Sequence, residues 1–114
     1  MLPVVPPGGG DSPYDSPSSF AGSPELVSLG YLVEDGLLDA SALAAPARLR
    51  ECTRARYGAA KRFRARRLRQ AFQRFQSGVG RHGLEELRER ERFWLPDYTL
   101  FAALKTQQHG KSWF

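Results

Sequence analysis

Apolar side chains recur at helical spacing over the middle of the chain, which predicts an amphipathic helix from about Tyr57 to Ser77. The apolar members of the pattern are Leu68, Ala71, Phe72, Phe75 and Val79, and Gly78 supplies a terminator. The other faces of this segment are almost entirely arginine. We therefore expect one side of the helix to be buried and the rest to face solvent.

Two short helical segments are predicted before this long one. The first runs from Leu29 to Asp35, because Ser28 can cap its free amides and Gly36 can end it. Asp39 is then expected to cap a further helical turn through Leu43, which Pro46 ends.

Two more helices are predicted after the long one. One spans about Leu84 to Phe93, with Glu85 and Glu89 spaced for ion pairs with Arg88 and Arg92. The last one begins at Pro96 and stops near Gly110, and Trp94 is expected to anchor the corner between them.

The first 27 residues show no helical periodicity. Residues 2–5 are apolar and stop at the cluster Pro6–Gly10, which predicts the end of a short buried strand. Residues 6–22 mix proline and glycine with Asp, Ser, Tyr and Phe, a combination that flexible spacers rarely contain. The segment indicates a rigid, ligand-facing loop. The expected fold is therefore mainly α, with an irregular Pro/Gly-rich N-terminal loop followed by four to five helices.

Composition limits the class of protein. A chain of 114 residues forms at most one small domain and buries only about two-thirds of its unfolded surface. The single Cys52 forms no internal disulfide, and neither His82 nor His109 has a neighbour at zinc-ligand spacing, so no metal site is expected. No signal peptide or membrane-spanning run is recognised, and we expect a soluble, cytoplasmic protein.

The net charge of +5 is unevenly distributed. Between Arg48 and Arg74 there are eleven Lys or Arg side chains against only Glu51. Such a segment can bind phosphates while Tyr57 or Phe63 stacks on bases, which would make the chain a small basic helical nucleic-acid-binding protein. Alternatively, it is a solvated outer face whose arginines pair with the acidic helices.

Several motifs together resemble one enzyme family. They are Leu2-Pro3 with Pro6 to Gly10, the loop Asp11-Ser12-Pro13-Tyr14 with Ser16, Ser18, Phe20, Ala21, Gly22 and Pro24, residues 32–38 (LVEDGLL), Tyr57-Gly58, Leu68 with Ala71-Phe72, Trp94-Leu95-Pro96-Asp97-Tyr98 with Leu100-Phe101, Leu104-Lys105, and Trp113. In this order they resemble the 4-α-glucanotransferases, the amylomaltase or disproportionating-enzyme family of (β/α)8-barrel (TIM barrel) transferases. The chain departs from the family pattern at Gly9, Asp15 and Ser23, where an aromatic residue, Gln and Asn are usual.

The resemblance implies transfer of α-1,4-glucan segments between maltooligosaccharides by a retaining mechanism, which requires no cofactor. It also implies that this chain is a fragment, because the family's catalytic carboxylates lie beyond the position of Phe114. Within the barrel, residues 1–27 would be a strand end with a substrate-facing loop, and residues 28–114 a helical insertion. The isolated fragment is expected to be inactive, and none of its acids is assigned a catalytic role.

The same resemblance places the substrate-binding residues in the early loop, since loops that follow barrel strands build the active-site face. They are Tyr14, Ser12, Asp11 and Gly10. The Tyr14 ring can stack on a glucose while its hydroxyl bonds a sugar oxygen, or it can merely pack the loop. Asp11 and Ser12 can contact sugar hydroxyls, or they can fold the turn onto its own amides. Gly10 and its neighbouring glycines permit backbone conformations that side chains would forbid.

Overall fold

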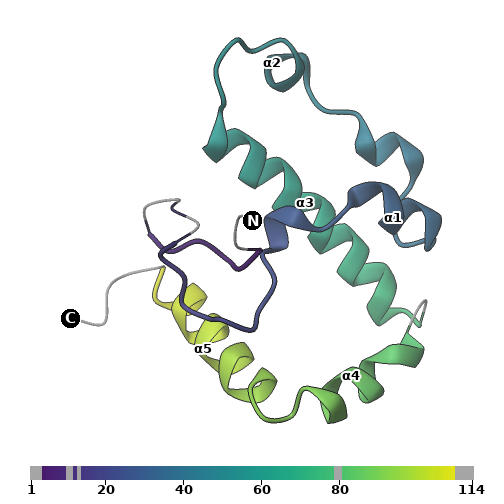
Figure 1. The fold of residues 1–114 in the computed structure, drawn as a ribbon. Helices are drawn as coiled ribbons and strands as arrows, with labels where there is room; N and C mark the ends of the chain where they lie inside the picture. The colour runs from purple at the N-terminus through teal and green to yellow at the C-terminus, as the bar shows by residue number, and fades with distance from the viewer. Residues whose placement is uncertain (1–3, 10–11, 13, 79–80, 110–114) are drawn as a thin grey trace. The chain divides into compact units, whose positions relative to one another are not determined.

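The structure is a computed structural model that describes residues 4–9, 12, 14–78 and 81–109. Its α-helices are α1 (Leu29–Glu34), α2 (Ala47–Arg50), α3 (Tyr57–Gln76), α4 (Leu84–Arg90) and α5 (Leu95–Gln107), and 3₁₀ turns occupy Pro24–Leu26, Ala40–Leu43 and Arg81–Gly83 (Figure 1). Throughout the described residues there is no strand, so the mainly α prediction is confirmed. The strand predicted at residues 2–5 is wrong for Val4 and Val5, and its first two residues lie outside the described part.

The chain divides into two compact units. One consists of residues 24–81, and the other combines residues 1–23 with residues 82–114. The functional division at residue 27 is not tested by this grouping and stays a prediction.

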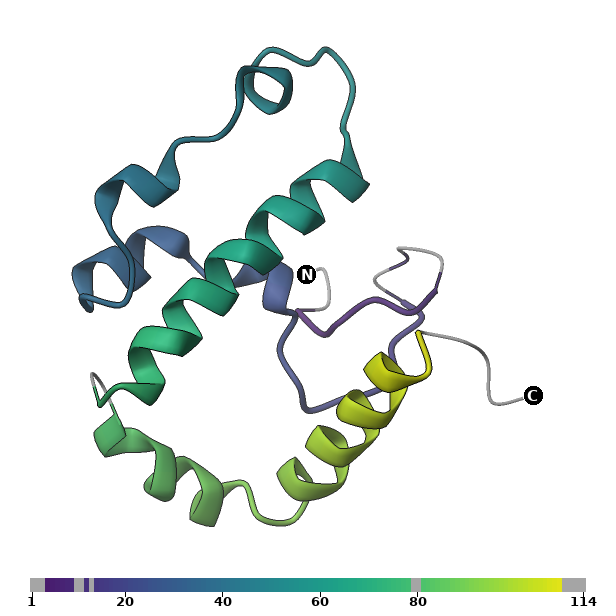
Figure 2. The ribbon, with the colours of Figure 1, turned by 180° about the vertical axis from the view of Figure 1, so that it is seen from behind.

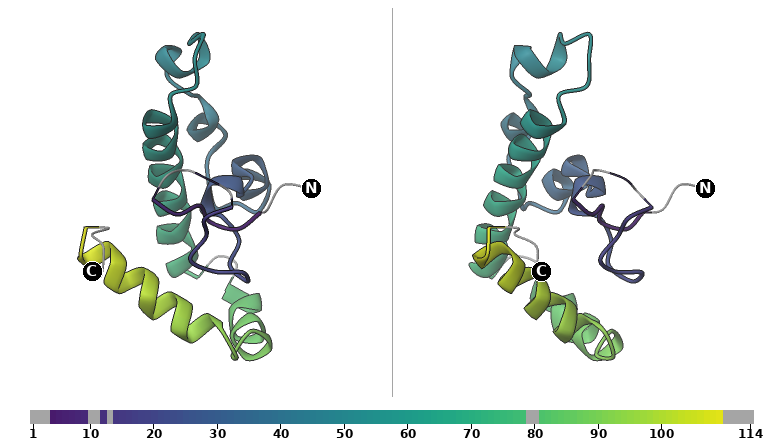
Figure 3. Two further views of the ribbon diagram at one scale, coloured as in Figure 1. Left: turned by 60° about the vertical axis from the view of Figure 1, so that its left-hand side comes forward. Right: turned by 90° about the vertical axis from the view of Figure 1, so that its left-hand side faces the viewer.

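The unit of residues 24–81 is organised on α3, which runs straight for 20 residues in every view (Figures 1 and 3). Leu29, Leu38 and Ala71 form its buried core, with Leu68 and Phe63 packed against them. Accordingly, α1 lies against α3 in both opposite views (Figures 1 and 2). The prediction of one buried face is confirmed, but most of α3 is exposed, and Ala71 is its one buried residue.

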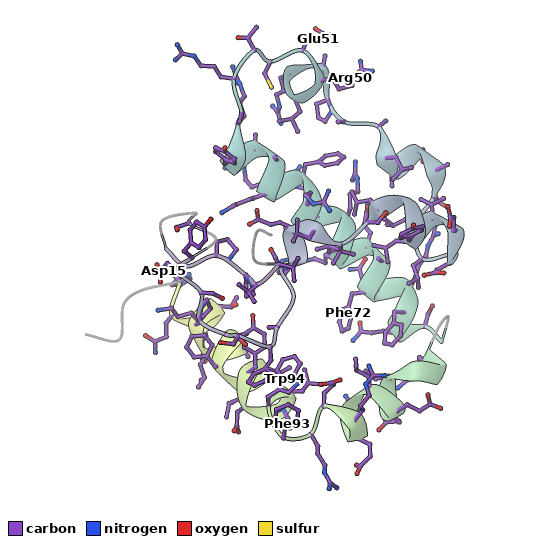
Figure 4. The ribbon with its side chains drawn as sticks, viewed as in Figure 1. Asp15, Arg50, Glu51, Phe72, Phe93 and Trp94 are labelled. Carbon is purple, nitrogen blue, oxygen red and sulfur yellow. The ribbon has the colours of Figure 1, made fainter. Side chains whose placement is uncertain are left out.

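One member of the expected apolar face is exposed. Phe72 is 55% exposed and stacks on Phe75 with ring centroids 6.4 Å apart, as its labelled position on α3 illustrates (Figure 4). Successive residues of a helix differ by 100° in direction, so Ala71 and Phe72 do not share one narrow core stripe. Val79 lies outside the described residues.

The ends of α1 and α3 follow from local sequence. The Ser28 hydroxyl accepts a 3.3 Å hydrogen bond from the Tyr31 amide, as an N-terminal cap does. Gly36 and Gly78 adopt φ angles of 74° and 118°, a region that L side chains rarely occupy, just after the two helices. Both predicted terminators are thus confirmed.

Asp39 occupies the expected N-cap position of a helical turn that ends at Leu43, but the expected side-chain capping bond is absent. Its carboxylate instead accepts a 2.6 Å hydrogen bond from Arg74 in α3. A charged long-range donor has therefore displaced the local amides as its partner, in keeping with the greater strength of charge-assisted hydrogen bonds.

The single-turn helix α2 was not predicted, because Pro46 was interpreted only as a stop. The Pro46 carbonyl accepts hydrogen bonds from the amides of Leu49 and Arg50, at 2.8 and 3.2 Å. Proline lacks a donor but keeps its acceptor, so it ends one element and opens the next.

In the other unit, α4 ends at Arg90, three residues before its predicted end at Phe93. Its expected ion pairs are present, Arg88 with Glu85 and Arg92 with Glu89, each at 2.8 Å. Helix α5 begins at Leu95, so Pro96 occupies its second position, where a missing amide donor costs nothing. None of these described helices is long and apolar enough to cross a membrane.

Candidate functional site

The early loop is closed at two levels by backbone hydrogen bonds. The Ser23 amide donates to the Val4 carbonyl at 2.8 Å, and the Gly8 amide donates to the Asp15 carbonyl. Ser23 is itself 7% exposed, so the outer closure is shielded from water. The two bonds therefore hold Val4 beside Ser23 and Gly8 beside Asp15, and we call the Gly8 end of the loop its tip.

Serine hydroxyls hold the returning half of the loop. Ser18 Oγ accepts from the amides of both Phe20 and Ala21 at 3.1 Å, and Ser16 Oγ donates to the Ser18 carbonyl at 2.8 Å. Hydroxyls of this kind satisfy backbone groups where no ladder is present. These bonds give a physical basis for the expected rigid loop.

Of the predicted substrate residues, Ser12 and Tyr14 are described, whereas Gly10 and Asp11 lie outside the described residues. The Ser12 hydroxyl accepts a hydrogen bond from the Tyr14 amide at 3.3 Å. This bond agrees with the interpretation in which Ser12 folds the turn onto its own amides. The Tyr14 side chain is 78% exposed. Within this chain the ring is not packed into the loop, and its face is available to a ligand.

Gly8 is required by the inner closure. A Cβ placed there would lie 2.7 Å from the carbonyl oxygen of Asp15, closer than real Cβ contacts come. At Gly9 a Cβ would meet nothing within 4 Å. The tip therefore depends on glycine at Gly8 and tolerates a side chain at Gly9.

An aromatic cluster supports the base of the loop. The Phe20 ring meets Phe93 edge-on at 5.2 Å and stacks on Trp94 at 5.9 Å, and Trp94 continues to Tyr98 at 6.0 Å. Phe93 and Trp94 lie side by side at the start of α5 (Figure 4). Pairs of this geometry contribute about 0.5–1.5 kcal/mol each beyond area burial. Trp94 thus anchors the corner as predicted; Trp113 is outside the described part.

Glu91 fixes the orientation of Trp94. One Glu91 oxygen accepts from the indole nitrogen of Trp94 at 2.7 Å, and the other accepts from Arg90 at 2.9 Å. These bonds, that of Trp94 first, lower the pKa of Glu91. The Arg74 hydrogen bond likewise lowers the pKa of Asp39. A general acid needs a raised pKa, so neither carboxylate is suited to that role in this chain.

The described residues contain no group of three or more His, Cys, Asp or Glu side chains placed to hold a metal ion. The contact of Phe20 with the start of α5 was not anticipated from the sequence. It joins positions more than 70 residues apart, and periodicity reports only local neighbours. A Pro/Gly-rich segment with one isolated phenylalanine is the signal that could have indicated it.

Comparison with known proteins identifies the family. The family model described as 4-alpha-glucanotransferase matches residues 1–114, and the chain belongs to this family. It is 38% identical over 116 residues to the 4-alpha-glucanotransferase of Thermus thermophilus, and 35% identical over 117 residues to that of Synechocystis. Identity to the 4-alpha-glucanotransferase of Clostridium butyricum is 34% over 113 residues.

Each of these alignments covers 99% of this chain, but the chain spans only 22–23% of the length of those relatives. The family recognised from the loop and helix motifs is therefore confirmed. Nothing in the comparisons supports the nucleic-acid-binding alternative. In the basic segment, Lys61 and Arg74 pair with Glu25 and Asp39, at 3.3 and 2.6 Å.

Proposed function

We propose that this chain is a substrate-holding segment of a 4-α-glucanotransferase, which transfers α-1,4-glucan segments between maltooligosaccharides in starch and glycogen metabolism. The observation that carries this proposal is the match of the family model over all 114 residues. The proposed division of labour places residues 1–27 at a barrel strand end and its substrate-facing loop, and residues 28–114 in a helical insertion. A cytoplasmic location is proposed as well, since Cys52 has no second cysteine to pair with.

Tyr14 is proposed to contact the glucan. Its exposed ring offers an apolar face to the C–H groups of a glucose unit, and its hydroxyl can donate to or accept from a sugar oxygen. The bonds of Ser12, Ser18 and Gly8 hold the loop that carries it. Ser12 therefore acts through loop geometry, and Asp11 and Gly10 are proposed as further glucan contacts.

The chemistry itself is proposed to come from carboxylates outside this chain. In a retaining transfer, one carboxylate attacks the anomeric carbon while a second, about 5 Å away, protonates the leaving glucan oxygen. The hydroxyl of an acceptor glucan then displaces the enzyme carboxylate and gives its proton back to the second group. The role of the chain is to orient the glucan for both steps.

A chimera tests the proposal. Residues 1–114 replace the matching segment of the Thermus thermophilus relative, and the purified chimera is incubated with maltotriose. We expect glucose release and redistribution into longer and shorter maltooligosaccharides. A second chimera in the Synechocystis relative guards against poor packing in one host. Folded chimeras that leave maltotriose unchanged in both hosts would refute the proposal.

The isolated chain serves as the complementary sample. We expect no glucose release and no change in chain length when the purified 114 residues are incubated with maltotriose. Detectable transfer by this sample would show that the reactive carboxylates are present in it, and would overturn the assignment of a purely substrate-holding role.

A further inference from the structure

The unit of residues 24–81 has a cleft that the proposed active-site loop does not use. It has a volume of about 520 Å³ and lies between the 3₁₀ turn Ala40–Leu43 and the C-terminal half of α3. Small-molecule sites typically enclose about 300–1,000 Å³, so its size suits a ligand of a few rings. Leu38 and Ala42 supply its apolar lining.

Two arginines of the cleft are held in place before any ligand arrives. Arg67 donates through Nε to the Ala42 carbonyl at 2.7 Å, and its guanidinium lies 4.7 Å from the centre of the Phe63 ring. Arg74 donates to Asp39 at 2.6 Å and to the Gly36 carbonyl at 3.5 Å. Fixed side chains lose little conformational entropy when a ligand binds, so the cleft is preorganised.

The polar groups of the cleft match a neutral polyol better than an anion. The Asp39 carboxylate accepts hydrogen bonds beside the donors of Arg74, which is the arrangement that two adjacent hydroxyls of a sugar can bridge. The carboxamides of Gln70 and Gln73 add both donors and acceptors. An anion would be repelled by the Asp39 carboxylate, which also offsets one of the two positive charges that Arg67 and Arg74 bring to the cleft.

We propose that this cleft is a second α-glucan-binding site, in which the C–H face of a glucose unit lies against Ala42. This assignment rests on the proposed function for the class of ligand. The hydroxyls of this glucose unit form hydrogen bonds with Asp39, Arg74 and the two glutamines. The site lies within the unit of residues 24–81, whereas the Tyr14 loop belongs to the other unit.

The test is a titration of the isotopically labelled 114-residue chain with maltotriose, followed through the side-chain amide resonances of Gln70 and Gln73 and, in every variant, through the backbone amide resonance of Ala42 in the same cleft. The chain carries Tyr14→Ala, so that the loop does not contribute. Circular dichroism first verifies the helices; should the isolated chain be unfolded, the chimera is titrated instead. We expect both glutamine resonances to shift and saturate.

Variants define the specificity of the effect. Gln70→Ala combined with Gln73→Ala should weaken maltotriose binding about tenfold or more, because each lost hydrogen bond lowers the affinity several-fold. Since Gln70 also contacts Arg67, at 3.4 Å, Gln73→Ala alone provides a variant that leaves this arginine in place. Gln76→Ala, an exposed change on the same helix outside the cleft, is the matched control and should bind as the parent does.

Two outcomes would overturn the proposal. One is equal maltotriose affinity in the parent, the Gln73→Ala variant and the double variant. The other is saturable binding of inorganic phosphate at these resonances without any response to maltotriose. Neither result depends on glucan transfer by the chimera. Loss of transfer with intact maltotriose binding would reject the proposed function and leave the cleft assignment standing.

Discussion

The exposed tyrosine of the early loop allows substrate binding to be separated from folding. Because the Tyr14 side chain is 78% exposed, its truncation to alanine should change stability by no more than about 0.5 kcal/mol. In the proposed complex the ring and hydroxyl supply one stacking contact and one hydrogen bond, together about 1–3 kcal/mol. At about 1.4 kcal/mol for each factor of ten, kcat/KM for maltotriose should fall roughly five- to a hundredfold.

The assay is maltotriose disproportionation by the chimera, with the thermal midpoint measured on the same preparations. Tyr14→Phe keeps the ring and removes the hydroxyl, so its kcat/KM should lie between that of the parent and that of Tyr14→Ala. Tyr31→Ala is the matched control, because Tyr31 is 67% exposed on α1 and has no proposed contact with glucan. A Tyr14→Ala variant that transfers as fast as the Tyr31→Ala control would refute the reasoning.

Three further predictions concern contacts within each of the two units. In urea unfolding, Leu38→Ala should lower the free energy of unfolding by about 2–3 kcal/mol, the lower part of the range for buried leucines, because Leu38 is 5% exposed in a small core. The control Leu26→Ala, at a 62% exposed site, should change it by no more than about 0.5 kcal/mol. Equal losses in the two variants would contradict the assigned core. Gly8→Ala should cost about 1–3 kcal/mol through the clash with Asp15 and should speed hydrogen exchange of the backbone amide at position 8, whereas Gly9→Ala should do neither. Matching results for the two variants would reject the inner closure. The pKa of Glu91 is lowered in the folded chain, so its bonds should stabilise the fold above pH 4.5, the ordinary pKa of the group, and this contribution should be lost as the pH falls through the folded pKa. The thermal midpoint of Glu91→Gln should therefore depend less on pH below 4.5 than that of the parent. Parallel pH profiles of the two proteins would argue against the bond to Trp94.

Local sequence predicted the elements whose ends are decided by neighbouring residues. Ser28 and Gly36 set α1, and the apolar spacing with Gly78 set α3, because a cap or a terminator acts within one turn. Long-range partners explain the errors. Asp39 binds Arg74, 35 residues away, so its behaviour does not follow from the turn that it precedes.

The candidate site was predicted in the same uneven way. Residue types alone indicated a rigid, ligand-facing loop, and the resemblance to the family singled out Tyr14 in it for contact with glucan, which stays a prediction. The cleft beside α3 was not predicted, because the sequence indicates a solvated helical face at Arg67, Gln70 and Arg74. Only folding of the segment after α1 onto that face turns them into walls of a cavity.

The hydrogen bond between Ser23 and Val4 has a consequence for how such enzymes diversify. Because the two stems of the loop meet there, the segment between them can change in length or composition without redirecting the chain that follows. Natural variation can therefore reshape this part of the molecule while the helices keep their course. The stem pair is also the natural splice point for exchanging this loop between related transferases.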